Sequence, residues 1–340
     1  MKKVLFIGSH LSNIRGTTGV SEQIANLIRN HFDILLVSSK ENRIWRLLDI
    51  LIAVLLRRYD TAHIDVFSNR AFIYADISSR IAKIRKKKMI MTLHGGMLPE
   101  RYRQNPARMK KVFSRADILQ SPSRYLIDFF ENENIHVGYM PNFIDLSKFP
   151  YGRDRVRHHT LLWVRAFSPE YRPELAIETL HRLLEHFPDT TLTMVGPDKG
   201  ILNRAKKLVT ELGLEEKVRF TGSVPNEELY RYYQTHHVYL NTTAYESFGV
   251  AVLEAAACGI PVVSTRVGEM PYIWDDGREI LLCDADPTEM ARQAASIFRQ
   301  PQLEESLSHS ARMRAEEFDW KRIRERWLNI LTEERRDVAR

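Results

Sequence analysis

The stretch that most constrains the fold of this chain is LNTTAYESFGVAVLEAAACGIPVVST, residues 240–265. It begins at the end of an apolar run, continues through a polar loop at 241–245, and enters a helical pattern near Ser247 or Phe248. The Gly-Ile-Pro sequence at 259–261 ends that pattern before a second apolar run. Strand, loop, helix and strand in this order make up the repeating unit of a parallel α/β sheet.

Two glutamates frame this predicted helix. Glu246 stands just before it, whereas Glu254 lies inside it, among valine, leucine and alanine residues. Burying a carboxylate without a partner is costly. We therefore expect either a neighbouring Arg or Lys or the hydroxyl groups of a ligand to satisfy Glu254.

The same alternation of short apolar runs and helical patterns extends along the chain. The predicted strands lie at 4–7, 33–37, 62–67, 89–93, 116–120, 136–140, 160–164, 192–195, 218–221, 237–240 and 262–263. A polar, charged segment at 151–159 is the predicted linker. The pattern predicts two facing Rossmann-like domains, 1–150 and 151–319, with parallel sheets and a cleft between them. A C-terminal helix at about 320–340 is expected to pack back on the first domain.

Composition indicates a cytoplasmic protein. With 44% hydrophobic and 27% charged residues, the chain has the balance of an ordinary globular protein. The apolar run near the N-terminus is too short for the core of a signal peptide, and the run at 47–56 is too short to span a bilayer. Cys258 and Cys283 have no metal-ligand spacing, so we expect reduced thiols.

Charge is shared unevenly between the two halves. Residues 1–150 carry 24 Lys and Arg against 13 Asp and Glu, whereas residues 151–340 carry 26 against 30. The basic half is suited to a phosphorylated substrate, an anionic membrane surface or nucleic acid, although solubility alone would also explain it. The chain shows no aromatic-rich basic motif or zinc module, so we expect no nucleic-acid partner.

The segment RIWRLLDILIAVLLRR at 43–58 is apolar nearly all round and flanked by arginines. Such a helix is either buried or touches lipid. An ordinary crossover helix remains one interpretation. The basic run at 85–88 adds weight to the other, a peripheral contact with an anionic membrane, at the inner face of the plasma membrane.

Two further features at strand ends suggest a site in the first half. The loop between the first predicted strand and helix contains Gly16 and Gly19, an arrangement that can hold phosphate, although the spacing is not G-x-G-x-x-G and a turn role is equally open. His94 is followed by two glycines on a strand-end loop, which favours a functional role.

The sequence Glu246-Ser247-Phe248-Gly249 with Glu254 resembles the E-x7-E motif of the family 4 glycosyltransferases, retaining enzymes of the GT-B fold. Further segments resemble other motifs of that family, in order along the chain. They are His94-Gly95, Pro141-Asn142-Phe143-Ile144-Asp145, Leu162-Trp163-Val164-Arg165, Met194-Val195-Gly196, Val218-Arg219-Phe220-Thr221-Gly222, and the run from Gly259 to Thr265 with Gly268.

The resemblance implies that the second domain binds a nucleotide-diphosphate sugar. Glu254 would bind the ribose hydroxyls, Glu246 the donor sugar and Arg165 the diphosphate. His94 would lie near the reacting sugar, so the implied catalytic residues are His94, Glu246 and Arg165. The implied donor-binding residues are Gly16, Gly19, Arg165, Arg172, Gly196, Gly222, Ser223, Glu246, Ser247, Phe248, Gly249, Val250 and Glu254.

The implied reaction is metal-independent transfer, with retention, to a hydroxyl of a glycan or lipid-linked acceptor in cell-surface glycan or glycolipid synthesis. No cofactor is implied beyond the nucleotide sugar. Asp284 and Asp286 spell D-x-D, but Asp286 is interpreted as a helix cap and no metal is assigned. Tyr171 occupies the position of the family's usual Lys, and Arg172 is the alternative phosphate contact. A nucleotide-sugar epimerase or phosphorylase on the same fold is the alternative function.

Overall fold

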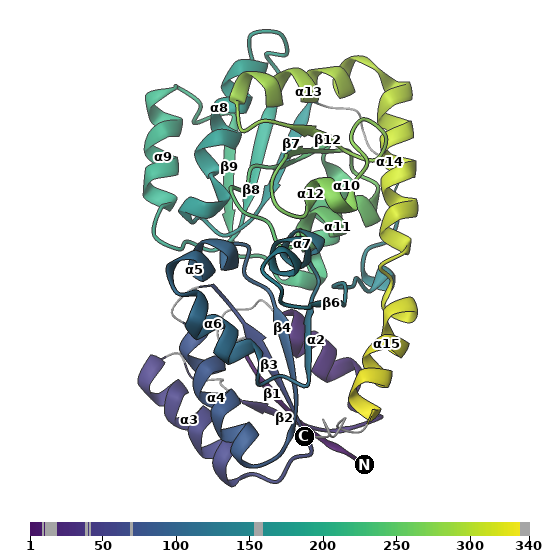
Figure 1. The fold of residues 1–340 in the computed structure, drawn as a ribbon. Helices are drawn as coiled ribbons and strands as arrows, with labels where there is room; N and C mark the ends of the chain where they lie inside the picture. The colour runs from purple at the N-terminus through teal and green to yellow at the C-terminus, as the bar shows by residue number, and fades with distance from the viewer. Residues whose placement is uncertain are drawn as a thin grey trace. The chain divides into compact units, whose positions relative to one another are not determined.

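The computed structural model describes residues 1–8, 10, 19–37, 40, 42–68, 71–152 and 159–333. This part of the chain forms two compact units (Figure 1). Unit 1 consists of Met1–Asn142 with the chain from Ile323 onward, and unit 2 of Phe143–Arg322. Each unit contains a six-stranded sheet in which every strand pair is parallel. Gly16 lies outside the described residues.

Unit 1 is built on a sheet with the strand order β2-β1-β3-β4-β5-β6. Its strands are β1 (Lys3–Ile7), β2 (Asp33–Val37), β3 (Thr61–Val66), β4 (Lys88–Leu93), β5 (Ile118–Ser121) and β6 (Gly138–Tyr139). Its helices are α2 (Val20–Leu27), α3 (Arg43–Leu56), α4 (Phe72–Ile84), α5 (Leu98–Gln104), α6 (Pro106–Phe113) and α7 (Arg124–Asn132). Every residue of β3 and β4 is buried, as expected for central strands covered on both faces.

Unit 2 repeats this architecture with the strand order β12-β11-β10-β7-β8-β9. Its strands are β7 (Thr160–Val164), β8 (Thr191–Val195), β9 (Val218–Gly222), β10 (Val238–Asn241), β11 (Val262–Thr265) and β12 (Leu281–Cys283). Its helices are α8 (Pro173–Leu183), α9 (Leu202–Glu211), α10 (Leu229–Thr235), α11 (Val250–Cys258), α12 (Met270–Ile273), α13 (Pro287–Arg299) and α14 (Pro301–Glu316), with 3-10 turns η1 (Leu146–Lys148), η2 (Pro169–Tyr171) and η3 (Asn226–Glu228).

The boundaries of the two units differ slightly from the domain boundaries predicted from the sequence. Residue 143 already belongs to unit 2, in which Ile144 N–H donates to the Phe318 carbonyl at 2.9 Å. The last helix, α15 (Trp320–Thr332), begins in unit 2 and continues in unit 1. In unit 1 its Arg326 donates to the Tyr139 carbonyl at 2.6 Å.

Each sheet contains one point at which the strand order reverses. In unit 1 this point lies between β1 and β3, and in unit 2 between β7 and β10. Ligands of open parallel sheets bind beyond the carboxyl ends of the strands at such points. Among the described residues, no helix combines the length and apolarity needed to cross a bilayer.

Candidate functional site

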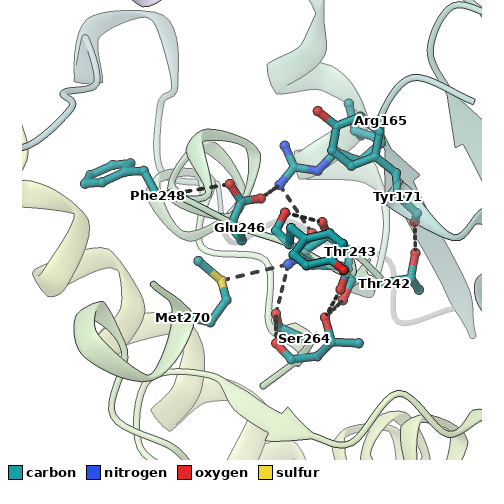
Figure 2. A network of polar contacts seen from close by, with 12 residues as sticks. Arg165, Tyr171, Thr242, Thr243, Glu246, Phe248, Ser264 and Met270 are labelled. Carbon is teal, nitrogen blue, oxygen red and sulfur yellow. Dashed lines mark hydrogen bonds and ion pairs between the residues drawn. The ribbon is translucent and has the colours of Figure 1, made fainter. Parts of the chain in front are cut away.

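An ion pair occupies the strand-reversal point of unit 2. Arg165 directly follows β7, and Glu246 lies in the loop between β10 and α11. Arg165 Nη2 donates to Glu246 Oε2 at 2.6 Å and to Asn241 Oδ1 at 3.3 Å (Figure 2). The two charged side chains are only 13% and 12% exposed. Burial alone would lower the pKa of the Arg165 guanidinium, but the adjacent Glu246 carboxylate holds that pKa above its usual range.

Tyr171 packs against this pair from η2. The guanidinium carbon of Arg165 lies 5.3 Å from the centroid of the Tyr171 ring, within the range of a cation–π contact. Burial raises the pKa of the Tyr171 hydroxyl, which therefore stays neutral. Tyr171 thus supplies an aromatic surface where the resemblance leads us to expect a second positive charge. The next residue, Arg172, is exposed at the start of α8 with a left-handed backbone (φ +45°).

The loop that carries Glu246 is held by side-chain hydrogen bonds. Trp163 Nε1 donates to Thr242 Oγ1 at 2.9 Å, and Thr265 Oγ1 donates to the Thr243 carbonyl at 2.7 Å. The Thr242 hydroxyl in turn donates to the Tyr171 carbonyl at 2.6 Å. Figure 2 shows Thr242 and Thr243 below the ion pair. These hydrogen bonds within the protein hold the loop that carries Glu246.

Helix α11 begins at Val250, later than the predicted start at Ser247 or Phe248. Gly249 precedes it with a left-handed backbone (φ +88°), which interrupts the helical conformation, and a side chain there would collide with Met270. The Phe248 N–H donates to Glu246 Oε1 at 3.3 Å, while the Phe248 ring packs in the core. Glu246 therefore receives hydrogen bonds at both carboxylate oxygens. Ser247 and Val250 are half-buried beside it.

The protein partner of Glu254 is a tyrosine hydroxyl and not the Arg or Lys that was one of the two expectations. Glu254 is 8% exposed, and its Oε2 accepts a hydrogen bond of 3.0 Å from the Tyr233 hydroxyl, on α10. Burial raises the pKa of Glu254 to about 7, although the Tyr233 hydrogen bond and the Arg165 charge act in the opposite direction. A neutral hydroxyl therefore satisfies this carboxyl, which titrates near neutral pH. Because α11 begins at Val250, Glu254 lies about one turn into the helix.

The remaining predicted donor-binding residues of unit 2 lie at other strand ends. Gly196 follows β8, where its φ of +149° and the nearby Arg165 carbonyl leave no room for a side chain. Gly222 and Ser223 lie at the end of β9, the edge strand. Two strand spacings, roughly 10 Å, separate β9 from β7. The structure therefore places Gly196 next to the ion pair and Gly222 with Ser223 further along the same sheet edge.

Unit 1 also has a polar cluster, which lies at the strand-reversal point of its own sheet. His94, directly after β4, lies with Nε2 3.0 Å from Asp65 Oδ1 at the end of β3. Asp65 is buried and also accepts a hydrogen bond from the Ser21 hydroxyl of α2. Burial alone would raise the pKa of Asp65, but His94 and Ser21 bring it to about 2. Asp65 is therefore a buried carboxylate that orients His94, whose side chain is 12% exposed.

A second histidine, His63, lies in the same cluster. Its Nε2 is 2.8 Å from Thr92 Oγ1, and its ring packs against Trp327 with centroids 5.4 Å apart. Burial lowers the pKa of His63 to about 4, although the Asp65 carboxylate opposes this shift. Neither His63 nor Asp65 was predicted from the sequence. The sequence did contain a sign of this cluster, because the predicted strand TAHIDV carries two ionisable residues where apolar ones would be expected.

The other predicted features of these regions have ordinary backbone roles. Gly19 precedes α2 with φ −69°, a conformation open to any residue, and its carbonyl accepts from Gln23 N–H at 3.0 Å. Asp286 caps α13 through Oδ1, which accepts from Glu289 N–H at 2.8 Å, so the helix-cap interpretation is confirmed. Across the described residues, no group of three or more His, Cys, Asp or Glu could hold a metal ion.

Comparison with known proteins identifies the class to which this fold and site belong. Residues 154–314 match the family described as Glycosyl transferases group 1, and the chain therefore carries a glycosyl transferases group 1 domain. That segment contains the Arg165–Glu246 pair and Glu254.

Curated relatives carry related sequences. The chain is 29% identical over 234 residues to D-inositol 3-phosphate glycosyltransferase of Corynebacterium jeikeium, a match that covers 62% of this chain and 56% of that protein. It is 30% identical over 155 residues to a phosphatidylinositol N-acetylglucosaminyltransferase subunit of Arabidopsis thaliana, covering 45% of this chain and 34% of that one. The chain thus spans about half the length, or less, of the curated relatives that it matches.

Solved structures share the fold over nearly the whole chain. HepE of Anabaena, in complex with UDP and glucose, matches with a TM-score of 0.75 at 16% identity, covering 98% of this chain and 100% of that chain. Sucrose-phosphate synthase of Thermosynechococcus elongatus matches with a TM-score of 0.76 at 18% identity, covering 97% and 98%. The predicted fold class is confirmed: the chain has the two-domain α/β fold, with two parallel sheets, of GT-B glycosyltransferases.

Proposed function

We propose that this protein transfers a sugar from a nucleotide-diphosphate sugar to an acceptor hydroxyl, with retention of configuration at the sugar. The observation that carries the proposal is the arrangement at the strand-reversal point of unit 2. There a buried cation, Arg165, and two buried carboxyls, Glu246 and Glu254, lie at the β7 and β10 ends and in the first turns of α11. A bound diphosphate needs a cation to balance its charge, which Arg165 supplies. The hydroxyls of the sugar and the ribose need hydrogen-bond acceptors, which the two carboxyls supply.

Arg165 is the proposed diphosphate ligand. Its Nη2 is engaged by Glu246 and Asn241, whereas no hydrogen bond of Nη1 to the described residues is found. A guanidinium carries five N–H donors in a planar fork, so one edge can hold Glu246 while another binds phosphate oxygens. In the transfer step, negative charge develops on the leaving diphosphate, and a fixed cation stabilises it. The leaving phosphate would take the proton of the acceptor hydroxyl on the same face, a scheme that requires no metal.

Glu254 is the proposed ribose ligand. Tyr233 engages only its Oε2, which leaves Oε1 to accept hydrogen bonds from ribose hydroxyls. Hydroxyl donors favour the ionised carboxylate. Nucleotide binding is therefore expected to lower the pKa of Glu254 from about 7 and to release a proton near neutral pH. Glu246, which already accepts from Arg165 and the Phe248 N–H, is the proposed contact of the donor sugar.

His94 of unit 1 is the proposed group near the reacting sugar, with Asp65 as its positioning residue. We propose that the acceptor is a glycan or a lipid-linked molecule and that it is anionic. The excess of Lys and Arg over residues 1–150 supports this proposal, as do the names of relatives that act on an inositol phosphate and on phosphatidylinositol. Two free, buried cysteines support a reducing, cytoplasmic compartment.

A thermal-shift screen of UDP, GDP and ADP tests the donor site. A nucleotide that binds only the folded protein raises the unfolding midpoint. We expect one of the three to do so for the wild type, and the shift to vanish in Arg165→Ala. Arg219→Ala, which removes an exposed arginine of the same unit, is the matched control and should keep the shift. The proposal fails if no nucleotide shifts the wild type, or if both variants respond equally.

A further inference from the structure

Helix α3 has an apolar face toward solvent in addition to the one toward the core. Ile50, Ala53 and Val54 are fully buried on the core side. The solvent side carries large apolar side chains spaced three or four residues apart, which places them on one face of the helix. This α3 stripe consists of Ile44 (71% exposed), Trp45 (65%), Leu48 (40%), Ile52 (54%), Leu55 (50%) and Leu56 (75%). A contiguous exposed apolar surface of this kind marks an interaction site.

Basic side chains gather at the C-terminal end of the stripe. Arg85, after α4, donates from Nη1 to the Val54 carbonyl at 2.7 Å and to the Arg57 carbonyl at 2.9 Å, which ties the ends of α3 and α4 together. Next to this junction Ile84 is 80% exposed. The α3–α4 basic cluster consists of the exposed residues Arg57, Arg58, Lys83 and Lys86. The acidic residues nearest in sequence are Asp49, Asp60 and Asp76. Asp76 is already paired with Arg80, Arg108 and Arg115, so positive charge predominates.

We propose that the α3 stripe and the α3–α4 basic cluster together dock on an anionic lipid bilayer. Apolar side chains with a rim of Lys and Arg match the boundary between acyl chains and anionic headgroups. Each Lys or Arg near such a surface adds to the attraction for anionic lipid. The helix has 14 residues and is about 21 Å long, too short for a hydrocarbon core of about 30 Å. It therefore lies in the plane of the interface, with Trp45 at headgroup depth.

The charge pattern favours lipid over a second copy of the chain. A two-fold dimer through this face would place one net-positive surface against another, whereas anionic headgroups neutralise the charge. The N-terminal half of the stripe also borders an open hollow of about 620 Å³ that offers room for part of a lipid molecule. The hollow is lined by Lys40, Asn42, Trp45, Leu48, Asp49 and Ile52. The surface lies wholly in unit 1, so the inference does not depend on the proposed donor site.

Vesicle flotation tests the proposal with the full chain. The wild type is expected to float with vesicles of equimolar phosphatidylcholine and phosphatidylglycerol, and to float less at high salt because the charge attraction is screened. Vesicles of phosphatidylcholine alone should bind it weakly. A wild type that stays with the soluble fraction in anionic vesicles overturns the proposal.

Two pairs of substitutions separate the apolar and the charged parts. Ile52→Ser with Leu56→Ser should reduce the bound fraction about ten-fold or more, and Lys83→Ser with Lys86→Ser about ten-fold at low salt. Both replace exposed side chains, and an unchanged unfolding midpoint would show that the fold is kept.

Substitutions outside the surface provide the controls. Met313→Ser removes a half-exposed apolar side chain from unit 2, and Lys111→Ser with Lys321→Ser removes two exposed charges. These variants should float like the wild type, and an equal loss of binding in controls and test variants contradicts the assignment. Sedimentation that shows a dimer dissociated by Ile52→Ser with Leu56→Ser, with no lipid binding, would assign the stripe to a second copy instead.

Discussion

The strand-reversal points of the two units both hold buried ionisable groups, but the two clusters respond to pH in opposite directions. In unit 1, burial lowers the pKa of His63 to about 4, so the folded state favours the neutral imidazole. In unit 2, burial raises the pKa of Glu254 to about 7, so the folded state favours the neutral carboxylic acid. The same cause, loss of hydration, acts on a base in one unit and on an acid in the other.

The consequence for stability follows from the sign of each shift. The depressed pKa of His63 means that its contribution is complete above pH 6.5 and is lost as the pH falls toward 4. The raised pKa of Glu254 means that ionising it costs stability as the pH rises from 4.5 through 7. We infer that His63 is a packing group of unit 1, whereas Glu254 is a group held ready to ionise when a ligand supplies hydroxyl donors.

The largest expected effect concerns the Arg165–Glu246 pair. Arg165→Ala should reduce sugar transfer by about a thousand-fold, because it removes the cation that faces the diphosphate. It should also destabilise unit 2 by about 3 kcal/mol, because Glu246 is left as a buried charge without its partner. Transfer assays and urea unfolding measure the two effects separately.

The double variant Arg165→Ala with Glu246→Gln distinguishes function from packing. It should recover most of the stability lost in Arg165→Ala, since the uncompensated charge is gone, and none of the activity. If the double variant transfers sugar at a rate near that of the wild type, the pair is structural and the donor site lies elsewhere.

Glu254→Gln tests the unit 2 side of the comparison. At pH 8.5 the variant should be more stable than the wild type by up to about 3 kcal/mol, because it removes a buried charge while its amide oxygen can still accept from Tyr233. At pH 5 the two proteins should unfold alike. Thermal unfolding midpoints across this pH range provide the measurement. A difference that does not change with pH would mean that Glu254 does not titrate near 7.

His63→Gln tests the unit 1 side. The wild type should lose about 3 kcal/mol between pH 6.5 and 4 through this residue, and the variant should lose correspondingly less because glutamine does not titrate. Glutamine can keep a contact with Thr92. His31→Gln, at an exposed histidine, is the control and should follow the wild type. If all three proteins lose the same stability between pH 6.5 and 4, His63 is not the group responsible for that loss.

The two clusters were predictable from the sequence to different degrees, for a physical reason. In unit 2 the helix start, Glu246 and Glu254 lie within one continuous stretch, so local pattern was enough to bring them together. In unit 1 the contact joins His94, Asp65 and Ser21, which come from three separated elements. The parallel register of β3 and β4, which pairs Asp65 with Thr92, brings His94 close to Asp65, and α2 brings Ser21 to the same carboxylate. Hydrophobic periodicity predicts strands but not their side-chain contacts.

Other details depended on individual backbone and side-chain conformations. Phe248 fits a helix start by residue type, but the left-handed Gly249 delays the helix to Val250. Tyr233 could not be assigned to Glu254 from the sequence, because its hydroxyl reaches the carboxyl only where α10 packs against α11. The strands at 33–37 and 160–164, in contrast, are confirmed at both ends, since they are short apolar runs with clear boundaries.

The smallest expected effect isolates the hydrogen bond between Tyr233 and Glu254. That bond favours the ionised carboxylate, so Tyr233→Phe should raise the pKa of Glu254 further and reduce the fraction ionised at pH 7. If ribose hydroxyls bind the carboxylate, nucleoside diphosphate affinity should fall roughly five-fold at pH 7 and recover at pH 8.5. Tyr239→Phe is the matched control, because that buried hydroxyl makes only a 3.4 Å contact with the Val164 carbonyl. Calorimetric titration at both pH values measures the affinities. If the affinity of Tyr233→Phe is still reduced at pH 8.5, the protonation of Glu254 does not explain the loss. The loss would then come from a change in the position of the ring.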